Sequence, residues 1–253
     1  LLKHGETRCT CFVSNLKMVS IFDLCFSYTE EPPYLLNHLS LDIPAGAYWS
    51  VVGPNGAGKS TFIKLVLGLL KPTSGRIEIS AQGVGYVPQM SAPAAASFPI
   101  TAEEVLDSWR RMRGIRSKDS IEHALSSVGM SAARHTLFGD LSGGQRQKIG
   151  IARALLCKAE YIIFDEATSS VDMESEREIW SCIDELSQTR TLIIISHRLS
   201  TIQNADVIYV LENGQIAQKG IHEELMQKTG LYRQLVEEQA KLEQIGEEEI
   251  LHA

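Results

Sequence analysis

The alternation of apolar and polar residues along the chain predicts short strands at several places. Residues 18–26 and 39–43 alternate as strands with one buried face do. The run AYWSVVG at 47–53 is continuously apolar, which is typical of a strand buried on both faces of a parallel sheet. The same patterns predict further strands at 75–80, 83–89, 161–165, 191–196, 206–211 and 215–220.

Helices are predicted between these strands. Residues 59–70 are apolar on nearly all sides, which indicates a buried helix. Thr101 and Glu104 have the spacing of a capping box ahead of a helix at about 102–113. No strand pattern appears from 90 to about 159, so this stretch predicts a helical insertion in an α/β domain with a mainly parallel sheet. Further helices are predicted at about 119–128, 173–187 and within 221–245.

The composition fits one large α/β domain, or one domain with an inserted subdomain, since 253 residues that are 44% apolar can bury a single core. The formal net charge of −7 disfavours nucleic acid as a partner, because proteins that bind duplex DNA are more often basic. The five cysteines are odd in number, which indicates unpaired thiols in a reducing compartment. Cys9 and Cys11 form a lone C-x-C pair, a weak signal for a metal site.

Both ends of the chain are predicted to lie outside the folded domain, which we expect at 18–245. Residues 1–17 lack the apolar core of a signal peptide and show no clear periodicity. We therefore expect a disordered extension there, translated from upstream of the natural start. Residues 246–253 form an acidic tail. No apolar run reaches the roughly 18 residues that a membrane-spanning helix needs.

Residues 53–60, GPNGAGKS, fit the phosphate-binding pattern G-x-x-x-x-G-K-[ST] and lie between a predicted strand and a predicted helix, as that pattern requires. The glycines let the backbone curl around phosphate oxygens and expose N–H groups at the helix N-terminus. Lys59 can reach the β- and γ-phosphates, Ser60 can ligate Mg²⁺ and Thr61 can add a hydroxyl. The predicted nucleotide-binding residues are Gly53, Pro54, Asn55, Gly56, Ala57, Gly58, Lys59, Ser60 and Thr61.

The apolar strand at 161–165 ends in a carboxylate, Asp165. In a parallel sheet this strand delivers Asp165 to the C-terminal edge, where it can hold Mg²⁺ directly or through water. Glu166 comes next and can face a water that attacks the γ-phosphate. Taken alone, a glutamate at a strand end is as often a solvated acid.

Three other side chains stand where they could sense a bound nucleotide. Gln89 ends a predicted strand and begins the helical insertion, so it could touch Mg²⁺ or the attacking water. His197 follows the strand at 191–196, where a γ-phosphate contact would lie. Tyr28 could stack on adenine. Without that context, a lone histidine or tyrosine is more often a structural residue.

A second anion site is predicted in LSGGQRQKIG, residues 141–150. Ser142 and Gln145 have the spacing of a capping box, and the glycines leave N–H groups unobstructed beside the positive end of a helix dipole. One chain would then carry two phosphate sites that are far apart in the sequence.

The chain resembles the nucleotide-binding subunits of ATP-binding cassette (ABC) transporters over about residues 18–240. The resemblance implies a P-loop NTPase fold, in which the mainly parallel sheet carries an antiparallel β subdomain and a helical subdomain at about 90–157. The motifs that carry it are, in order, Tyr28, GPNGAGKS, Gln89, LSGGQ, YIIFDE, SSVD at 169–172 and His197.

Carried over motif by motif, the resemblance assigns roles to single residues. Tyr28 is expected to stack on adenine, Glu166 to be the catalytic base and Asp172 to be the D-loop aspartate. Gln89 is expected to be the Q-loop glutamine and His197 the switch histidine. ATP and Mg²⁺ are the implied cofactors, and the metal ligands are expected to be Ser60, Gln89 and Asp165.

The resemblance also implies a dimer, either a homodimer or this chain with a paired ATPase subunit. Each ATP would lie between the P-loop of one subunit and the LSGGQ motif of the other, which would explain why one chain carries two anion sites. The residues expected to contact ATP across the interface are Leu141, Ser142, Gly143, Gly144 and Gln145.

The two halves of the chain resemble different branches of the family. GYVPQ, FPITAEEVL and FGDLSGGQRQKIGIARALL are similar to the ATPase subunits of bacterial zinc/manganese importers. From about residue 160, TSSVD, ISHRLSTIQNADVIYVLENGQ and GLYRQLVEEQ are similar to the ATPase domains of exporters, and Arg198 stands where importer subunits more often have aspartate. The direction of transport therefore stays open at this point.

We expect an ATP-binding and ATP-hydrolysing subunit that powers solute transport by a separate integral membrane permease, with metal-ion import as the first expectation. It would be cytoplasmic and peripheral on the inner face of the cell membrane. The alternatives are a detached nucleotide-binding domain of an exporter, or a non-transport ABC ATPase of the cluster-assembly kind. Repair ATPases of this family need a long coiled-coil insertion, and the sequence has none.

Overall fold

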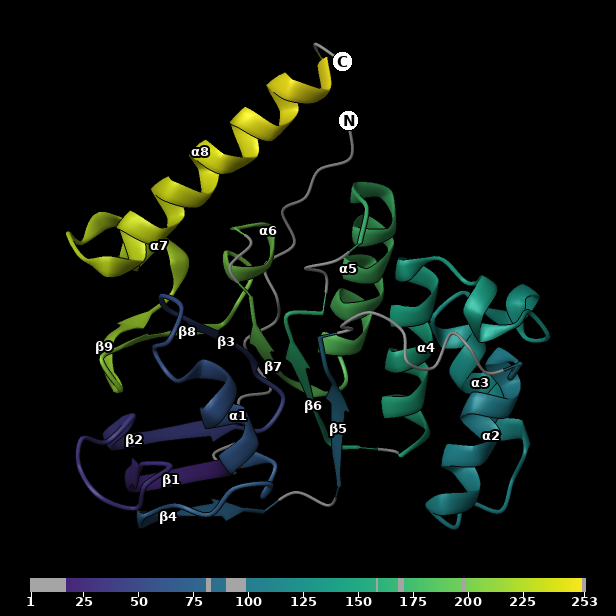
Figure 1. Ribbon diagram of the computed structural model, residues 1–253, viewed down its shortest axis with the longest axis horizontal. Helices are drawn as coiled ribbons and strands as arrows, with labels where there is room; N and C mark the ends of the chain where they lie inside the picture. The colour runs from purple at the N-terminus through teal and green to yellow at the C-terminus, as the bar shows by residue number, and fades with distance from the viewer. Residues whose placement is uncertain are drawn as a thin grey trace.

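The computed structural model describes residues 17–80, 83–89, 99–157, 159–167, 171–196 and 199–251. Their strands form one large and one small sheet, with helices on both faces of the large sheet (Figure 1). The predictions for residues 1–16, which include Cys9 and Cys11, lie outside the described residues, as does His197.

The large sheet has the strand order β5-β6-β7-β3-β8-β9. Its first five strands run parallel, whereas β9 pairs with β8 in the antiparallel direction at one edge. The central strands are buried, which explains why they are continuous apolar runs and confirms the mainly parallel sheet. The strands are β3 (Tyr48–Val52), β5 (Val84–Val87), β6 (Tyr161–Asp165), β7 (Thr191–Ile195), β8 (Val207–Glu212) and β9 (Gln215–Gly220).

The small sheet is antiparallel, with the order β2-β1-β4. Phe62 of α1 (Lys59–Val66) shares one apolar core with Leu24 of the small sheet and Ile193 of the large sheet, so α1 packs between the two sheets. The helix ends at Val66 instead of residue 70, because Gly68 adopts φ +70° and turns the chain out of the helix. The strands of the small sheet are β1 (Lys17–Phe26), β2 (Leu36–Pro44) and β4 (Ser74–Ile79).

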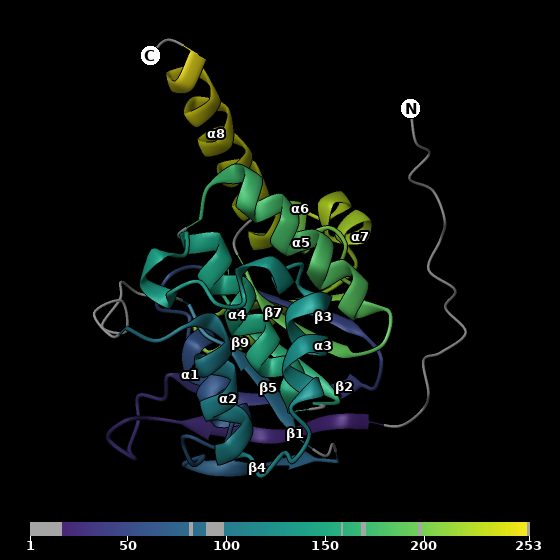
Figure 2. The same cartoon turned by 90° about the vertical axis from the view of Figure 1, so that its right-hand side faces the viewer.

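The helices between β5 and β6 cover the opposite face of the large sheet (Figure 2). Both predicted capping boxes are present, with Thr101 and Glu104 at the start of α2 and Ser142 and Gln145 at the start of α4. Buried side chains of α4 share a second core with Phe164 of β6 and other residues on that face of the sheet. The helices are α2 (Ala102–Met112), α3 (Asp119–Ser127) and α4 (Gly143–Leu156), with short 3₁₀ turns at Ser131–Ala133 and Phe138–Asp140.

The last part of the chain carries a helix that projects from the body of the molecule (Figure 1). The hydroxyl of buried Tyr232 lies 2.7 Å from Nδ1 of His222 and anchors the start of this helix, which continues past the predicted end at 245. Among the described residues, no helix is both long enough and apolar enough to cross a bilayer. The helices after β6 are α5 (Met173–Ser187), α6 (Leu199–Ile202), α7 (His222–Gln227) and α8 (Leu231–Leu251).

Candidate functional site

The turn between β3 and α1 has the geometry of a phosphate cradle. Gly53 adopts φ +153°, and a Cβ there would lie 2.2 Å from the carbonyl oxygen of Leu211, so the close passage of the two backbones requires glycine. Gly58 is the N-cap of α1, and no side chain caps this helix, whereas α2 and α4 both begin with a capping box. The first N–H groups of α1 are therefore left for another acceptor, and a phosphate group fits there.

The side chain of Lys59 folds back over this cradle. Its Nζ donates hydrogen bonds to the carbonyl oxygens of Gly53, at 2.7 Å, and Pro54, at 2.9 Å. Burial lowers the pKa of Lys59, while the nearby carboxylates of Glu166 and Asp165 oppose that shift. Lys59 thus lies within the loop that is predicted to bind phosphate. It is also close enough to the carboxylates at the end of β6 for their charge to raise its pKa.

Asp165 is the last residue of β6, and its side chain is half-buried. The hydroxyl of Tyr86, on the neighbouring strand β5, donates a hydrogen bond to Oδ2 of Asp165 at 3.1 Å. Burial raises the pKa of Asp165, while the bond from Tyr86 lowers it. Burial and the adjacent carboxylate together raise the pKa of Tyr86 to about 12, so Tyr86 stays a hydrogen-bond donor at neutral pH.

The donor set fits Mg²⁺ bound together with phosphate, not alone. No group of three or more His, Cys, Asp or Glu side chains that could hold a metal occurs among the described residues. Mg²⁺ commonly takes one or two carboxylates and completes its shell with phosphate oxygens and water. Asp165 and the exposed hydroxyl of Ser60, in the first turn of α1, supply that kind of set.

Glu166 breaks the regular geometry of the strand that precedes it. Its backbone adopts φ +48°, in the left-handed region, and its N–H donates to the carbonyl oxygen of Ile195 at 3.0 Å. A residue with a Cβ pays about 1–2 kcal/mol for this conformation, and such strain gathers at functional sites. The half-buried side chain of Glu166 follows directly after Asp165, at the same end of β6.

The strand register brings Gln89 to the same edge of the sheet. Val87 of β5 pairs with Phe164 of β6, so Gln89 follows the end of β5 as Glu166 follows the end of β6. Gln89 is exposed. The roles of Gln89 and His197 stay predictions.

Tyr28 lies beside the phosphate loop. Its hydroxyl is 3.1 Å from Oγ1 of Thr61, and its ring packs edge-on against Phe26 at 4.9 Å between centroids. The side chain is 64% exposed, so one ring face can receive a ligand. This contact joins two residues that were predicted separately as nucleotide ligands.

The signature loop, which we define as Leu141, Ser142, Gly143, Gly144 and Gln145, begins α4. Oγ of Ser142 accepts from the N–H of Gln145 at 3.1 Å, and the side chain of Gln145 accepts from the N–H of Ser142 at 3.0 Å. The predicted cap is therefore confirmed, and the structure adds a contact on the Cα side of one glycine. Gly144 is buried against the side chain of Ser175 on α5.

Asp172 has a structural contact that the sequence reading missed. It is the N-cap of α5, and its Oδ1 accepts from the N–H of Ser175 at 2.9 Å. An aspartate directly before the predicted helix at 173–187 is a signal that could have revealed this cap. Tyr86 was also missed, since nothing in its local sequence shows that β5 pairs with the strand that carries Asp165.

A family model described as ABC transporter matches residues 36–169, which include the P-loop, Gln89, the signature loop, Asp165 and Glu166. The chain belongs to the ABC transporter family. The prediction of this family from the motifs is confirmed.

Known members of the family differ in how much of their length this chain covers. It is 37% identical over 217 residues to the high-affinity zinc uptake system ATP-binding protein ZnuC of Bacillus subtilis, covering 79% of this chain and 93% of that protein. It is 36% identical over 237 residues to the ATP-dependent lipid A-core flippase of Vibrio vulnificus, covering 86% of this chain but 40% of the flippase. The chain thus spans less than half of this exporter-type relative.

A solved structure confirms the fold. The chain is 32% identical to a bacterial Atm1-family ABC exporter with ATP bound, with a TM-score of 0.75 over 88% of this chain and 42% of that one. The domain is thus an ATP-binding domain of the ABC transporter family, whose members hydrolyse ATP to power transport.

Proposed function

We propose that two ATPase domains, either two copies of this chain or this chain and a paired one, enclose ATP head to tail and drive a membrane permease. The observation that carries the proposal is the separation of the two anion sites. The P-loop leads into α1, whose buried residues belong to the core on one face of the large sheet, and the signature loop leads into α4 on the opposite face. Figure 1 shows α1 and α4 on opposite sides of β5 and β6. A helix N-terminus without a phosphate in its own chain can be completed by a nucleotide bound to a partner.

Within one chain, the P-loop would hold the triphosphate. Lys59 would exchange the carbonyl oxygens of Gly53 and Pro54 for phosphate oxygens, which are stronger acceptors for an ammonium group. Tyr28 would stack on the adenine. Asp165 and Ser60, with Gln89 as a further ligand, would hold Mg²⁺, which neutralises charge on the phosphate oxygens when bound.

Glu166 would act as the general base. It takes a proton from a water whose oxygen bonds to the γ-phosphorus, while the bond from that phosphorus to the oxygen of ADP breaks, giving ADP and phosphate. The strained backbone of Glu166 and its position at the end of β6 support this role, since catalytic groups often sit in such conformations. His197 would contact the γ-phosphate or this water.

The signature loop would bind the γ-phosphate of the partner's ATP through Ser142 and the N–H groups of Gly143 and Gly144, and Asp172 would approach the same interface. Loss of the γ-phosphate on hydrolysis would remove these contacts and loosen the dimer. The binding free energy of the nucleotide would in this way become movement of the two domains.

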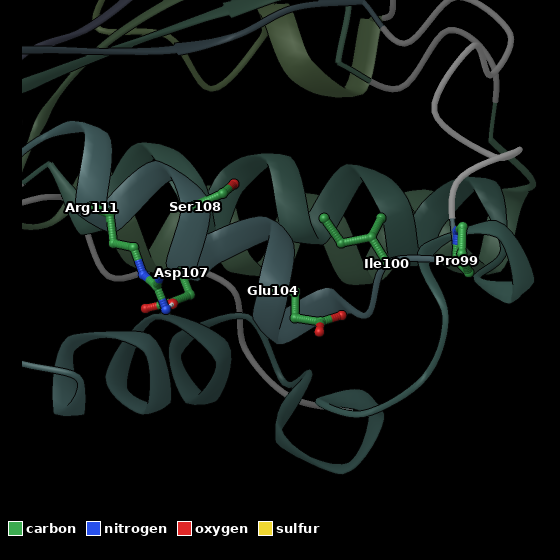
Figure 3. Close-up of a pocket in the computed structure, with 6 residues that line it drawn as sticks. All are labelled: Pro99, Ile100, Glu104, Asp107, Ser108 and Arg111. Carbon is green, nitrogen blue, oxygen red and sulfur yellow. Dashed lines mark ion pairs between the residues drawn. The ribbon is translucent and has the colours of Figure 1, made fainter.

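A cavity at the start of α2 suits the permease. It has a volume of about 620 Å³, and its lining includes apolar Ile100 and the ion pair of Asp107 with Arg111, whose atoms are 2.6 Å apart (Figure 3). Pro99 and Ile100 of its lining lie between Gln89 and α2 in the sequence, so a helix seated there could pass movement along the chain toward Gln89. The lining residues are Pro99, Ile100, Glu104, Asp107, Ser108 and Arg111.

For the transported solute we propose a metal ion, zinc or manganese, taken up by a permease that binds this domain on the cytoplasmic face of the cell membrane. The relative named for high-affinity zinc uptake supports this choice, because the chain covers 93% of it. Export is the second candidate, supported by the lipid A-core flippase and by the exporter with ATP bound.

The sandwich is tested with Glu166→Gln, which should bind ATP and hold it unhydrolysed. We expect this variant to elute as a dimer from a sizing column with ATP and Mg²⁺, and as a monomer with ADP. Adding Ser142→Arg should abolish the dimer, since the new side chain fills the signature loop. A dimer that forms equally with ADP, or that survives Ser142→Arg, would contradict the proposal.

The permease is tested by capture of tagged chain from detergent-solubilised membranes of its own source, followed by mass spectrometry. Recovery of a polytopic membrane protein of the metal-uptake kind supports import, and one of the flippase kind supports export. Repeated recovery of soluble proteins alone would contradict the transport function.

A further inference from the structure

The N-termini of α4 and α5 lie against each other at two small residues. A Cβ on Gly144 would lie 2.3 Å from Cβ and 2.5 Å from Oγ of Ser175, so only glycine allows the two helices to approach this closely. One turn further along both helices, Nζ of Lys148 and Oε2 of Glu178 form an ion pair at 2.5 Å. The side chain of Lys148 is only 12% exposed, so this ion pair extends the contact between α4 and α5 beyond Gly144 and Ser175.

Ser175 also holds Asp172. Its backbone N–H donates to Oδ1 of Asp172 at 2.9 Å, and the bonds from the backbone and the hydroxyl of Ser175 lower the pKa of Asp172, which keeps the cap ionised. One serine therefore touches a glycine of the signature loop with its side chain and the D-loop aspartate with its N–H. Both of these neighbours belong to the face that the proposed function assigns to the partner's ATP.

We propose that Ser175 is a positioning residue that fixes Asp172 and Gly144 in one rigid unit, so that both reach the partner's ATP together. This inference rests on the proposed function, because it assigns the trans-ATP role to the signature loop. Ser175 itself touches neither nucleotide nor water in this account. It acts by keeping the N–H of Gly144 and the carboxylate of Asp172 at a constant spacing while the domains close.

The test enlarges Ser175 and leaves Asp172 and Gly144 themselves unchanged. Ser175→Val adds a second branch at Cβ, where Gly144 leaves no room, and should push α4 away from α5. Ser175→Ala loses the hydroxyl bond to Asp172 but keeps the Cβ contact and the backbone N–H, so it should lose much less dimerisation than Ser175→Val. Ser181→Val is the matched control, because it makes the same change at an exposed position of α5.

In the Glu166→Gln background, we expect Ser175→Val to weaken ATP-dependent dimerisation by at least about tenfold, since overpacking of this kind commonly has effects of that size. Binding of a fluorescent ATP analogue to the isolated chain should stay unchanged, because the chain's own P-loop lies elsewhere. The inference would be overturned if Ser175→Val dimerised as well as Ser181→Val. It would also be overturned if Ser175→Val lost dimerisation and analogue binding equally, because that result indicates general damage to the fold.

Hydrogen–deuterium exchange of the nucleotide-free chain gives a second readout that does not depend on dimerisation. Ser175→Val should speed exchange in both 141–147 and 171–176, and Ser181→Val in neither. Faster exchange in 171–176 alone would overturn the coupling. If Glu166→Gln itself fails to dimerise with ATP, the sandwich proposal falls, and this exchange pattern alone decides whether Ser175 couples the two segments.

Discussion

The hydroxyl of Tyr86 lies 3.1 Å from Oδ2 of Asp165, across the parallel pair of β5 and β6. The tyrosine is a donor to a carboxylate whose pKa is raised by burial, and its hydrogen bond acts against that increase. Tyr86 is itself kept protonated, because burial and the same carboxylate raise its pKa to about 12. The hydrogen bond therefore favours the ionised form of a half-buried acid next to the phosphate loop.

We expect Tyr86→Phe to move the acid limb of the ATPase pH profile to higher pH. Without the donor, the pKa of Asp165 rises further, so the carboxylate that is proposed to hold Mg²⁺ is lost at a higher pH during acidification. The measurement is kcat/KM for ATP across the acidic range at fixed Mg²⁺. Tyr161→Phe, at the opposite end of β6, is the control and should leave the limb in place. An unshifted limb in Tyr86→Phe would show that the bond has no effect on the titration.

Asp165→Asn should stabilise the nucleotide-free chain at neutral pH while abolishing turnover. Because the folded-state pKa of Asp165 is raised, the stability that its protonated carboxyl contributes is fully present below the unfolded pKa and is lost as pH rises through the folded-state pKa. At neutral pH the buried charge is a cost, and the amide removes it. We expect Tm to rise by about 2–4 °C if the cost is about 1 kcal/mol in a domain of this size.

The pH dependence distinguishes this effect from a general gain in packing. The increase in Tm should shrink as the buffer is acidified toward the unfolded pKa of an aspartate, where both states of the parent are protonated. Asp184→Asn, on the exposed side of α5, should change Tm little at either pH. A stabilisation that is the same at neutral and acidic pH would mean that the charge of Asp165 is not its source.

The sequence predicted the parts of the site that depend on local signals. The P-loop, the ends of the central strands and both capping boxes follow from patterns within a few residues, and the structure agrees with them. The bond of Tyr86 with Asp165 and the contact of Gly144 with Ser175 each join segments far apart in the chain. No local pattern encodes which strand or helix lies next to which, so these relations needed the fold.

Gly53→Ala should destabilise the fold more than Gly56→Ala does. Both glycines have positive φ, which costs an alanine about 1 kcal/mol, but only Gly53 is also confined, with the carbonyl oxygen of Leu211 2.2 Å from the position of a Cβ. A backbone atom of β8 cannot move aside cheaply, so we expect a further loss of about 1–3 kcal/mol. Urea unfolding of the nucleotide-free variants measures the difference. Equal losses would indicate that φ alone sets the requirement for glycine at residue 53.

Tyr28→Ala should weaken ATP binding, whereas Tyr28→Phe should not. The ring is 64% exposed beside the P-loop, so its loss should not unfold the chain, and stacking of a base on an aromatic side chain is worth about 1–3 kcal/mol. Phenylalanine keeps the stacking face and loses only the contact with Thr61. Titration with a fluorescent ATP analogue should therefore give a Kd about five- to a hundredfold higher for Tyr28→Ala than for Tyr28→Phe.

Inorganic tripolyphosphate has no base to stack, so its competition against the analogue should reveal the same affinity in both variants. If tripolyphosphate binding falls as much as ATP binding, Tyr28 acts on the phosphate loop through Thr61 and not on adenine.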